Sequence, residues 1–317
     1  MKETLEILDH VRLNFSPSGL FILNLTIAFV MFGVALDIKW EHFRDVVLKP
    51  KSAVTGIISQ FVLLPLVTFL LILVINPTPT VALGMILVAA CPGGNISNFM
   101  SAMSRGNVAL SVSLTGFATL VATFMTPLNF AFWGSWYIKI YNTAGSGLLR
   151  PLEIDFFQMV QTVFILLGIP IVLGLLCSQY FPKLTAKLKK PIRKSSIIIF
   201  IGMVIVLLAA NFTNFLSFVH LIFLIVLVHN ALALGTGFVF STLLKRPGAD
   251  RRAITIETGI QNSGLALVLI FNPKIFPPEL ELGGMAVIAA WWGVWHIVSG
   301  LSLAAFWSRK QVPQPAI

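Results

Sequence analysis

Nine long apolar stretches follow one another along this chain, separated by short segments that carry most of its charges. A helix needs about 20 apolar residues to cross the hydrocarbon core of a bilayer. Only 11% of the 317 residues are charged, against roughly 25% in soluble domains. The pattern therefore predicts an all-α polytopic membrane protein, with spans near 18–37, 52–75, 80–104, 107–136, 156–181, 193–213, 216–244, 250–272 and 282–307.

Basic residues are distributed unevenly between the two sets of connecting segments. If the N-terminus lies outside, 17 of the 22 Lys and Arg residues fall on the inner side, where membrane proteins carry their basic excess. We therefore expect a multi-pass protein of the cell inner (plasma) membrane with a cytoplasmic C-terminus. This distribution explains the net charge of +10 without a nucleic-acid partner. The N-terminus lacks the layout of a signal peptide, and residues 4–15 are expected to form a helix on the membrane surface.

Two of the predicted spans are interrupted by polar, glycine-containing runs, at residues 90–98 and 257–264. Pro92 removes a backbone donor, and Gly93 and Gly94 allow the backbone to leave helical geometry. With nine spans, the first four and the last four cross the membrane in opposite senses, and the interrupted spans are the third and the eighth. Interruptions at matching positions of two halves are typical of an inverted-repeat transporter. A simple bend is the alternative for the first run taken alone.

Glu257 is the only acidic residue in the interior of a predicted span, and the other eleven lie in predicted loops, in tails or at the very end of a span. A carboxylate at membrane depth costs about 2.5 kcal/mol or more and persists only with a partner. No basic residue lies in the middle of the same span, so a cation from solution is the simplest partner. The carboxylate therefore indicates an ion-coupled transporter.

Several neutral oxygen-bearing side chains lie around the two interruptions, and hard cations such as Na⁺ prefer oxygen ligands. Ser111 and Thr115 are four residues apart and share a helix face. The candidate ligands are Gln60, Ser97, Asn98, Ser111, Thr115, Glu257 and Gln261. Hydroxyl groups that bond backbone carbonyls at helix contacts are the alternative for the serines and threonines. One carboxylate among neutral oxygens favours Na⁺ over H⁺ coupling, which usually uses several titratable groups.

Two histidines also lie in predicted spans. His229, followed by Asn230, is interpreted as part of an interhelical hydrogen bond. His296 either lines a cavity or packs within an aromatic cluster. Intramembrane enzyme chemistry is not expected, because the spans contain no Asp pair, no His-Glu-x-x-His, no Gly-x-Ser-x-Gly and no Walker-type loop.

Four segments together resemble the bile acid:sodium symporter family over residues of about 28–307. They are Cys91-Pro92-Gly93-Gly94 with Ser97-Asn98, then residues 104–111, residues 257–266, and Trp295-His296 with Ser299-Gly300. The chain looks most like the bacterial branch. It departs in having Asn95 in place of a small hydroxyl residue and Ile297 in place of Asn. Bacterial members commonly have ten spans, so this chain is expected to lack the first.

The resemblance implies two sodium sites that share Glu257. The first would use Ser97, Asn98, Ser111, Thr115 and Glu257. The second would use Gln60, Glu257, Gln261 and the backbone carbonyls of Thr258 and Ile260. An organic anion would bind near Asn95, Asn262 and His296.

The resemblance also implies two domains that move against each other. A panel domain would comprise 18–37 and 156–213. A core domain would comprise 52–136 and 216–307, with crossing breaks near 92–95 and 258–264. Residues 1–17 would lie outside and 308–317 would form a cytoplasmic tail.

The expected function is sodium-coupled import of an organic anion, bile-acid-like or a small carboxylate, by alternating access. A proton-coupled or antiport carrier with similar broken helices is one alternative. An ion-binding sensor or channel that moves no solute is the other.

Overall fold

A computed structural model describes residues 5, 17–36, 50–143, 156–210, 212–276 and 280–312. Within these ranges every regular element is a helix, and the one β-type pairing is an isolated bridge between Gly93 and Gln261. The prediction of an all-α membrane protein is therefore confirmed for the described part of the chain. The expected helix at 4–15 and the far end of the tail lie outside the described residues.

The helices follow the predicted apolar stretches closely. In chain order they are α2 (Pro17–Ala35), α4 (Pro50–Ile58), η1 (Ser59–Leu63), α5 (Leu64–Ile75), α6 (Pro79–Ala90), α7 (Ile96–Met103), α8 (Val108–Thr143), α9 (Phe156–Val163), η2 (Phe164–Gly168), α10 (Ile169–Tyr180), α11 (Pro182–Ala210), α12 (Phe212–Leu243), α13 (Gly248–Gly259), α14 (Ser263–Ile270) and α15 (Gly283–Ser308).

Two of these elements, η1 and η2, are short π-helical segments inside longer helices. Each ends just before a helix whose second residue is proline, Pro65 in α5 and Pro170 in α10. Proline lacks the N–H that would continue the α-helical ladder, which gives the backbone a reason to change its hydrogen-bond register at that point. The change turns Ser59 and Gln60 of η1 into the interior, where both are buried.

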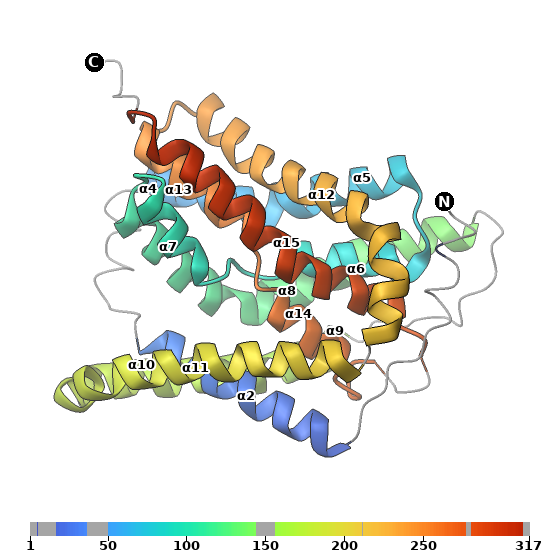
Figure 1. Ribbon diagram of the computed structural model, residues 1–317, viewed down its shortest axis with the longest axis horizontal. Helices are drawn as coiled ribbons and strands as arrows, with labels where there is room; N and C mark the ends of the chain where they lie inside the picture. Colours follow the sequence, from blue (N-terminus) through green and yellow to red (C-terminus); the bar gives the residue numbers. More distant parts are fainter. Residues whose placement is uncertain are drawn as a thin grey trace.

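The helices α2, α10 and α11 lie together along one side of the molecule, at the bottom of Figure 1. Gly174 of α10 faces α2 so closely that a Cβ there would overlap Phe32 O and Ala35 Cβ. Small residues of this kind let membrane helices approach without a gap.

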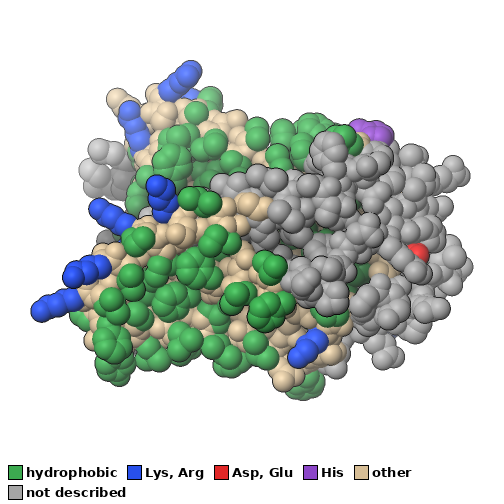
Figure 2. All heavy atoms as spheres, turned by 60° about the horizontal axis from the view of Figure 1, so that its bottom comes forward, with side chains coloured by type: hydrophobic (Ala, Val, Ile, Leu, Met, Phe, Trp, Pro, Cys, Tyr) green, Lys and Arg blue, Asp and Glu red, His purple; other side chains and the backbone are tan. Residues whose placement is uncertain are grey.

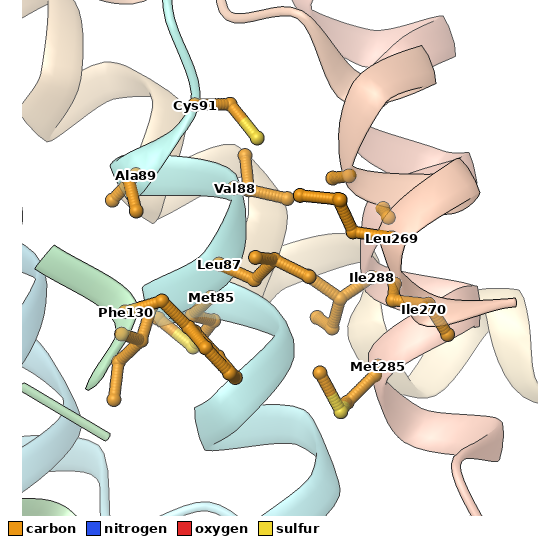
Figure 3. Packing of buried hydrophobic residues seen from close by; sticks show 14 of the residues in the cluster. Met85, Leu87, Val88, Ala89, Cys91, Phe130, Leu269, Ile270, Met285 and Ile288 are labelled. Atoms are coloured by element: carbon orange, nitrogen blue, oxygen red, sulfur yellow. The ribbon is translucent and has the colours of Figure 1, made fainter. Parts of the chain in front are cut away.

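The centre of the remaining helices is the contact between α6, α14 and α15. Figure 3 shows Leu87 and Val88 of α6 directed toward Leu269 of α14 and Ile288 of α15. A Cβ on Gly84 would come within 2.7 Å of the Met285 backbone. Because glycine stands at this contact, the backbones of α6 and α15 pack directly on each other.

Within the described residues, five helical stretches are long and apolar enough to cross a membrane. They are Pro50–Ile75, Val108–Tyr141, Phe156–Tyr180, Ile222–Leu243 and Gly283–Ser308. Many large apolar side chains are exposed on the surface, and Figure 2 shows them covering much of one face, with Lys and Arg gathered toward one end. An apolar surface of this kind suits contact with lipid.

Three boundaries differ from the prediction. The basic segment near 183–194 is not a loop, because α11 begins at Pro182 and continues through it. Proline suits the first position of a helix, and lysine and leucine are good helix formers. The helix α8 continues to Thr143 rather than ending near 136. The second interruption is shorter than expected, since α13 extends through Gly259.

Candidate functional site

The two interrupted helices meet at their breaks. The break between α6 and α7 comprises residues 91–95, and the break between α13 and α14 comprises 260–262. The Gly94 N–H donates to the Ile260 carbonyl oxygen at 2.7 Å, and the Asn262 N–H donates to the Pro92 carbonyl oxygen at 2.8 Å. Backbone groups at membrane depth must find partners within the protein. Each break therefore satisfies part of the backbone of the other.

Gly93 pairs with Gln261 in the bridge that joins the two breaks. A Cβ added at this residue would overlap the Glu257 carboxylate, with Oε1 as its nearest atom. Only a residue without a side chain leaves that carboxylate in place. The glycine is therefore required for the position of Glu257, besides permitting the break itself.

The Glu257 side chain is 1% exposed and receives hydrogen bonds from two other helices. Ser97 Oγ of α7 donates to Oε2 at 2.6 Å. Thr115 Oγ1 of α8 lies 2.8 Å from Oε1 and 3.0 Å from Oε2. Asn98 Oδ1 accepts from Ser111 Oγ at 2.9 Å and lies 3.2 Å from Thr115 Oγ1. The structure thus brings together all five side chains expected in the first sodium site.

The charge of Glu257 is surrounded by neutral groups. Its neighbours are hydroxyl groups, and no ion pair joins it to Lys, Arg or His within the described part of the chain. Nor do three or more His, Cys, Asp or Glu side chains gather anywhere among the described residues. The donor set therefore suits a hard cation bound by oxygen rather than a transition metal.

A second group of oxygens lies around Gln261, whose amide connects the second break to η1. Its Nε2 donates to the Thr258 carbonyl oxygen at 2.7 Å, and its Oε1 lies 3.4 Å from Gln60 Nε2. Thr258 Oγ1 donates to Ser59 Oγ at 2.9 Å. The Ile260 carbonyl accepts the Gly94 N–H and keeps a second lone pair. The residues expected in the second site are thus neighbours, although no hydrogen bond links Glu257 to Gln60 or Gln261.

The three residues expected to touch substrate have different surroundings. Asn95 is exposed at the tip of the first break. Asn262 is half-buried, and its Oδ1 accepts the Leu265 N–H at the start of α14. His296 is buried, with Nδ1 2.7 Å from the Trp292 carbonyl oxygen. No hydrogen bond joins these three described side chains to one another.

The face of α15 that carries His296 lies against the second break. Gly293 is adjacent to Ser263, and Gly300 is adjacent to Ile260. Residues 293, 296 and 300 share one face of a helix. The His296 ring therefore lies on the side of α15 that covers the break, and it is buried there.

Asn230 of α12 supports the second break and was not singled out as a site residue. Its Nδ2 donates to the Gly259 carbonyl oxygen at 2.8 Å, at the end of α13, and its Oδ1 accepts from the Ser299 hydroxyl of α15. The predicted interhelical hydrogen bond at His229 is confirmed, with Nε2 2.8 Å from Thr68 Oγ1. The sequence does show an amide within an apolar span at Asn230, which is a signal of a buried polar contact. It does not show which residues that amide contacts.

Arg252, near the start of α13, also has a role that its sequence position did not indicate. Its guanidinium donates to the backbone oxygen of Ser104 at 2.6 Å, at the end of α7, and to that of Trp307 at 3.1 Å, at the end of α15. Further bonds reach the oxygens of Lys310 and Gln311. A cation placed at the carboxyl ends of helices is stabilised by their dipoles. Arg252 thereby connects α13 to the carboxyl ends of α7 and α15, away from the crossing of the two breaks.

Comparisons with known proteins agree with this architecture. Residues 24–218 match the Sodium Bile acid symporter family. The chain is 33% identical over 306 residues to the uncharacterized sodium-dependent transporter YocS of Bacillus subtilis (strain 168), covering 94% of this chain and 88% of that protein. It is 31% identical over 296 residues to the probable chloroplastic sodium/metabolite cotransporter BASS1 of Arabidopsis thaliana, covering 92% and 68%.

A third relative is the ileal sodium/bile acid cotransporter of Cricetulus griseus, which is 25% identical over 256 residues, 80% of this chain and 70% of that protein. These relatives are transporters and not enzymes, as the sequence predicted. The chain therefore belongs to the sodium bile acid symporter family, and its two broken helices cross at a buried carboxylate in a multi-pass membrane protein of that family.

Proposed function

We propose that this protein is a symporter that couples the inward movement of two Na⁺ to the import of an organic anion by alternating access. The observation that carries the proposal is the buried Glu257 carboxylate, which neutral oxygens from α7 and α8 surround without an ion-pair partner among the described residues. A charge buried in this way is stable only with a compensating cation. The sodium dependence named for the relatives supports Na⁺ as that cation.

The first proposed sodium site uses Ser97, Asn98, Ser111, Thr115 and Glu257. Its ligands come from three helices that are distant in sequence, α7, α8 and α13. An ion bound between them would draw the two broken helices together and hold the geometry of both breaks. The hydroxyl groups that donate to the carboxylate would then turn their lone pairs toward the ion.

The second proposed site uses Gln60, Glu257, Gln261 and the carbonyls of Thr258 and Ile260. The contact between the Gln60 and Gln261 amides supports it, because the Gln60 side chain of η1 thereby lies beside the second break. Glu257 would belong to both sites, so that loading one ion would favour loading the other. This shared carboxylate is the proposed origin of coupling between the two ions.

The organic anion is proposed to bind beside the breaks, near Asn95, Asn262 and His296. The helices α7 and α14 both begin at the breaks, and helix N-termini offer N–H groups and a positive dipole end to an anion. The names of two relatives, a sodium/metabolite cotransporter and a sodium/bile acid cotransporter, support an organic solute, which we propose to be a bile-acid-like compound or a small carboxylate.

We further propose nine spans with the N-terminus outside and the C-terminus in the cytoplasm. In this topology α2, α10 and α11 belong to a panel domain, 18–37 with 156–213. The broken helices belong to a core domain, 52–136 with 216–307. The separate side that α2, α10 and α11 occupy in Figure 1 supports this division. Movement of the core against the panel would expose the breaks to each side of the membrane in turn.

Thermal stability of the purified protein in increasing NaCl tests the sodium sites, with KCl and choline chloride as ionic-strength controls. An ion that binds only the folded state stabilises it by about 2.7 kcal/mol at 100 times its Kd. We expect a rise specific to sodium, which Glu257→Ala removes. Asp250→Asn is the matched control, because Asp250 is a carboxylate of the same helix that bonds Ser52 and Asn107 instead.

Uptake into proteoliposomes distinguishes this proposal from its alternatives. A sodium gradient should drive accumulation of the anion above its outside concentration, and Glu257→Ala should abolish that accumulation. Uptake driven by a proton gradient alone would favour a proton-coupled or antiport carrier. Sodium binding without accumulation of any anion would favour a sensor or channel. Normal sodium-driven uptake by Glu257→Ala would refute the proposed site.

A further inference from the structure

Four lysines form a stripe along the first turns of α11, away from the proposed transport site. Lys183, Lys187, Lys190 and Lys194 are spaced by four, three and four residues, which places them on one face of a helix. All four are exposed. We call this set the lysine stripe. Four of the six basic residues of this segment thus share one face, an alignment that orienting the chain in the membrane does not require.

The contact between α10 and α11 directs the stripe outward. Thr185 is buried, and its Oγ1 donates to the Cys177 carbonyl oxygen of α10 at 3.0 Å. At 3.6 residues per turn, Thr185 lies about 200° around the helix from Lys183. The lysine stripe therefore faces away from α10.

The charge of the stripe is not balanced by carboxylates nearby in the sequence. No Asp or Glu occurs between Asp155 and Asp250, a stretch that includes α9 to α12. Figure 2 shows Lys and Arg side chains projecting at one end of the molecule, beyond the apolar surface. The stripe thus presents concentrated positive charge at this end.

Exposed aromatic and aliphatic residues place the stripe at the depth of lipid headgroups. Tyr180, the last residue of α10, is 68% exposed, and Phe181, between α10 and α11, is 61% exposed. Exposed aromatic residues are enriched where the hydrocarbon meets the headgroups. Leu184 and Leu188 are also exposed and lie beside the lysine stripe around the helix. Lysines next to an exposed apolar face are typical of helices that lie in the membrane interface.

We propose that the lysine stripe is a binding site for anionic phospholipids. The lysines would bind headgroup phosphates of the adjacent leaflet, while Phe181, Leu184 and Leu188 contact the acyl chains. A soluble anion would gain nothing from these apolar neighbours, which is why the geometry favours a lipid. The inference does not depend on sodium coupling, because no residue of the stripe belongs to the proposed ion sites.

Native mass spectrometry of the detergent-purified full chain tests this inference, with phosphatidylglycerol and phosphatidylcholine as probes. We expect preferential, salt-sensitive retention of phosphatidylglycerol. Replacing Lys183, Lys187, Lys190 and Lys194 by Gln should weaken it at least about tenfold, since each lysine near an anionic surface contributes substantially. The matched control replaces Lys245, Arg246, Arg309 and Lys310 by Gln, four charges outside the stripe, and should retain most of the binding.

Two further measurements keep the outcome decisive. If the fourfold variant does not fold, the double variants Lys183→Gln with Lys187→Gln, and Lys190→Gln with Lys194→Gln, should each lose part of the binding. Glycerol phosphate and inorganic phosphate should not displace the lipid at millimolar concentration, because they lack acyl chains. Equal retention of both lipids, equal loss in the control variant, or displacement by free phosphate would overturn the proposal.

Discussion

The two breaks that cross in this protein are built differently. The first, residues 91–95, contains Pro92, Gly93 and Gly94, and carries no charge. The second, residues 260–262, contains no proline or glycine, but follows a helix that carries Glu257 and precedes a helix capped by Asn262. The first break therefore contributes shape and backbone groups, whereas the second is associated with charge and amides.

The surroundings of the two breaks differ in the same way. Three side chains from two other elements reach the second break or the adjacent end of α13, namely Asn230 of α12 and Ser59 and Gln60 of η1. The N-cap position of α7, at the first break, is Asn95, which makes no side-chain capping bond. The comparison suggests that the second break is held in a fixed geometry and that the first adapts to it. Five variants test this interpretation, from the largest expected effect to the smallest.

Gly93→Ala should have the largest effect. Its Cβ would overlap the Glu257 carboxylate, so the variant should lose the stabilisation by sodium almost completely. Gly94→Ala is the matched control, because its Cβ would lie 3.5 Å from the nearest atom, the Gln261 carbonyl oxygen. That variant should retain the sodium response and change stability by about 1 kcal/mol or less. Equal responses in thermal unfolding with NaCl would contradict the assigned role of Gly93.

Asn230→Ala should lower the stability of the protein by about 1–3 kcal/mol, because it removes the side-chain donor to the buried Gly259 carbonyl and one of the two acceptors of the Ser299 hydroxyl. Denaturant unfolding in detergent measures the loss. Thr236→Ala on the same helix is the control, since its hydroxyl bonds only the Leu232 carbonyl, and it should change stability by about 0.5 kcal/mol or less. If both variants behave alike, the second break does not depend on α12.

Gln60→Ala should weaken apparent sodium affinity by roughly five- to tenfold, equivalent to about 1 kcal/mol for one lost ligand. The KM for the anion at saturating sodium should change less. Sodium titration of uptake measures both. Val62→Ala in the same π-helical segment provides the comparison, because Val62 is 54% exposed and faces away from the site. Unchanged sodium dependence would remove Gln60 from the second site.

The smallest effects are expected at the two asparagines. Asn262→Ala removes the N-cap of α14 and should cost about 1 kcal/mol of stability. Asn95→Ala should cost almost nothing, because Asn95 is exposed and caps nothing through its side chain. If Asn95 contacts the anion, its variant should raise the KM without a change in the melting temperature. A larger stability loss at Asn95 than at Asn262 would reverse the comparison of the two breaks.

Much of the helical architecture could be predicted, because membrane helices require long apolar stretches and the breaks require proline, glycine and polar residues. The prediction was wrong at Lys183–Lys194, where a dense run of charges was taken for a loop although lysine and leucine favour helix. Hydropathy measures the preference for lipid over water and does not distinguish a polar helix from a polar loop.

The proximity of some candidate residues could be predicted from the sequence. Ser97, Thr115 and Glu257 are in hydrogen-bond contact, and their role as ion ligands stays a prediction. The supporting residues were not predictable. Asn230 reaches Gly259, and Arg252 reaches Ser104 and Trp307, through contacts that only the packing of helices creates. A single sequence states which side chains are polar and does not state which of them meet.

The bridge between the breaks is made by main-chain atoms alone, the Gly94 and Asn262 N–H groups and the Ile260 and Pro92 carbonyls. Such bonds do not depend on which side chains the four residues carry, except that proline at position 94 or 262 would remove a donor. Ligand preference can therefore diverge through substitutions at the tips, Asn95 among them, while the crossing that holds the ion site stays intact. The scaffold and its selectivity can change independently of each other.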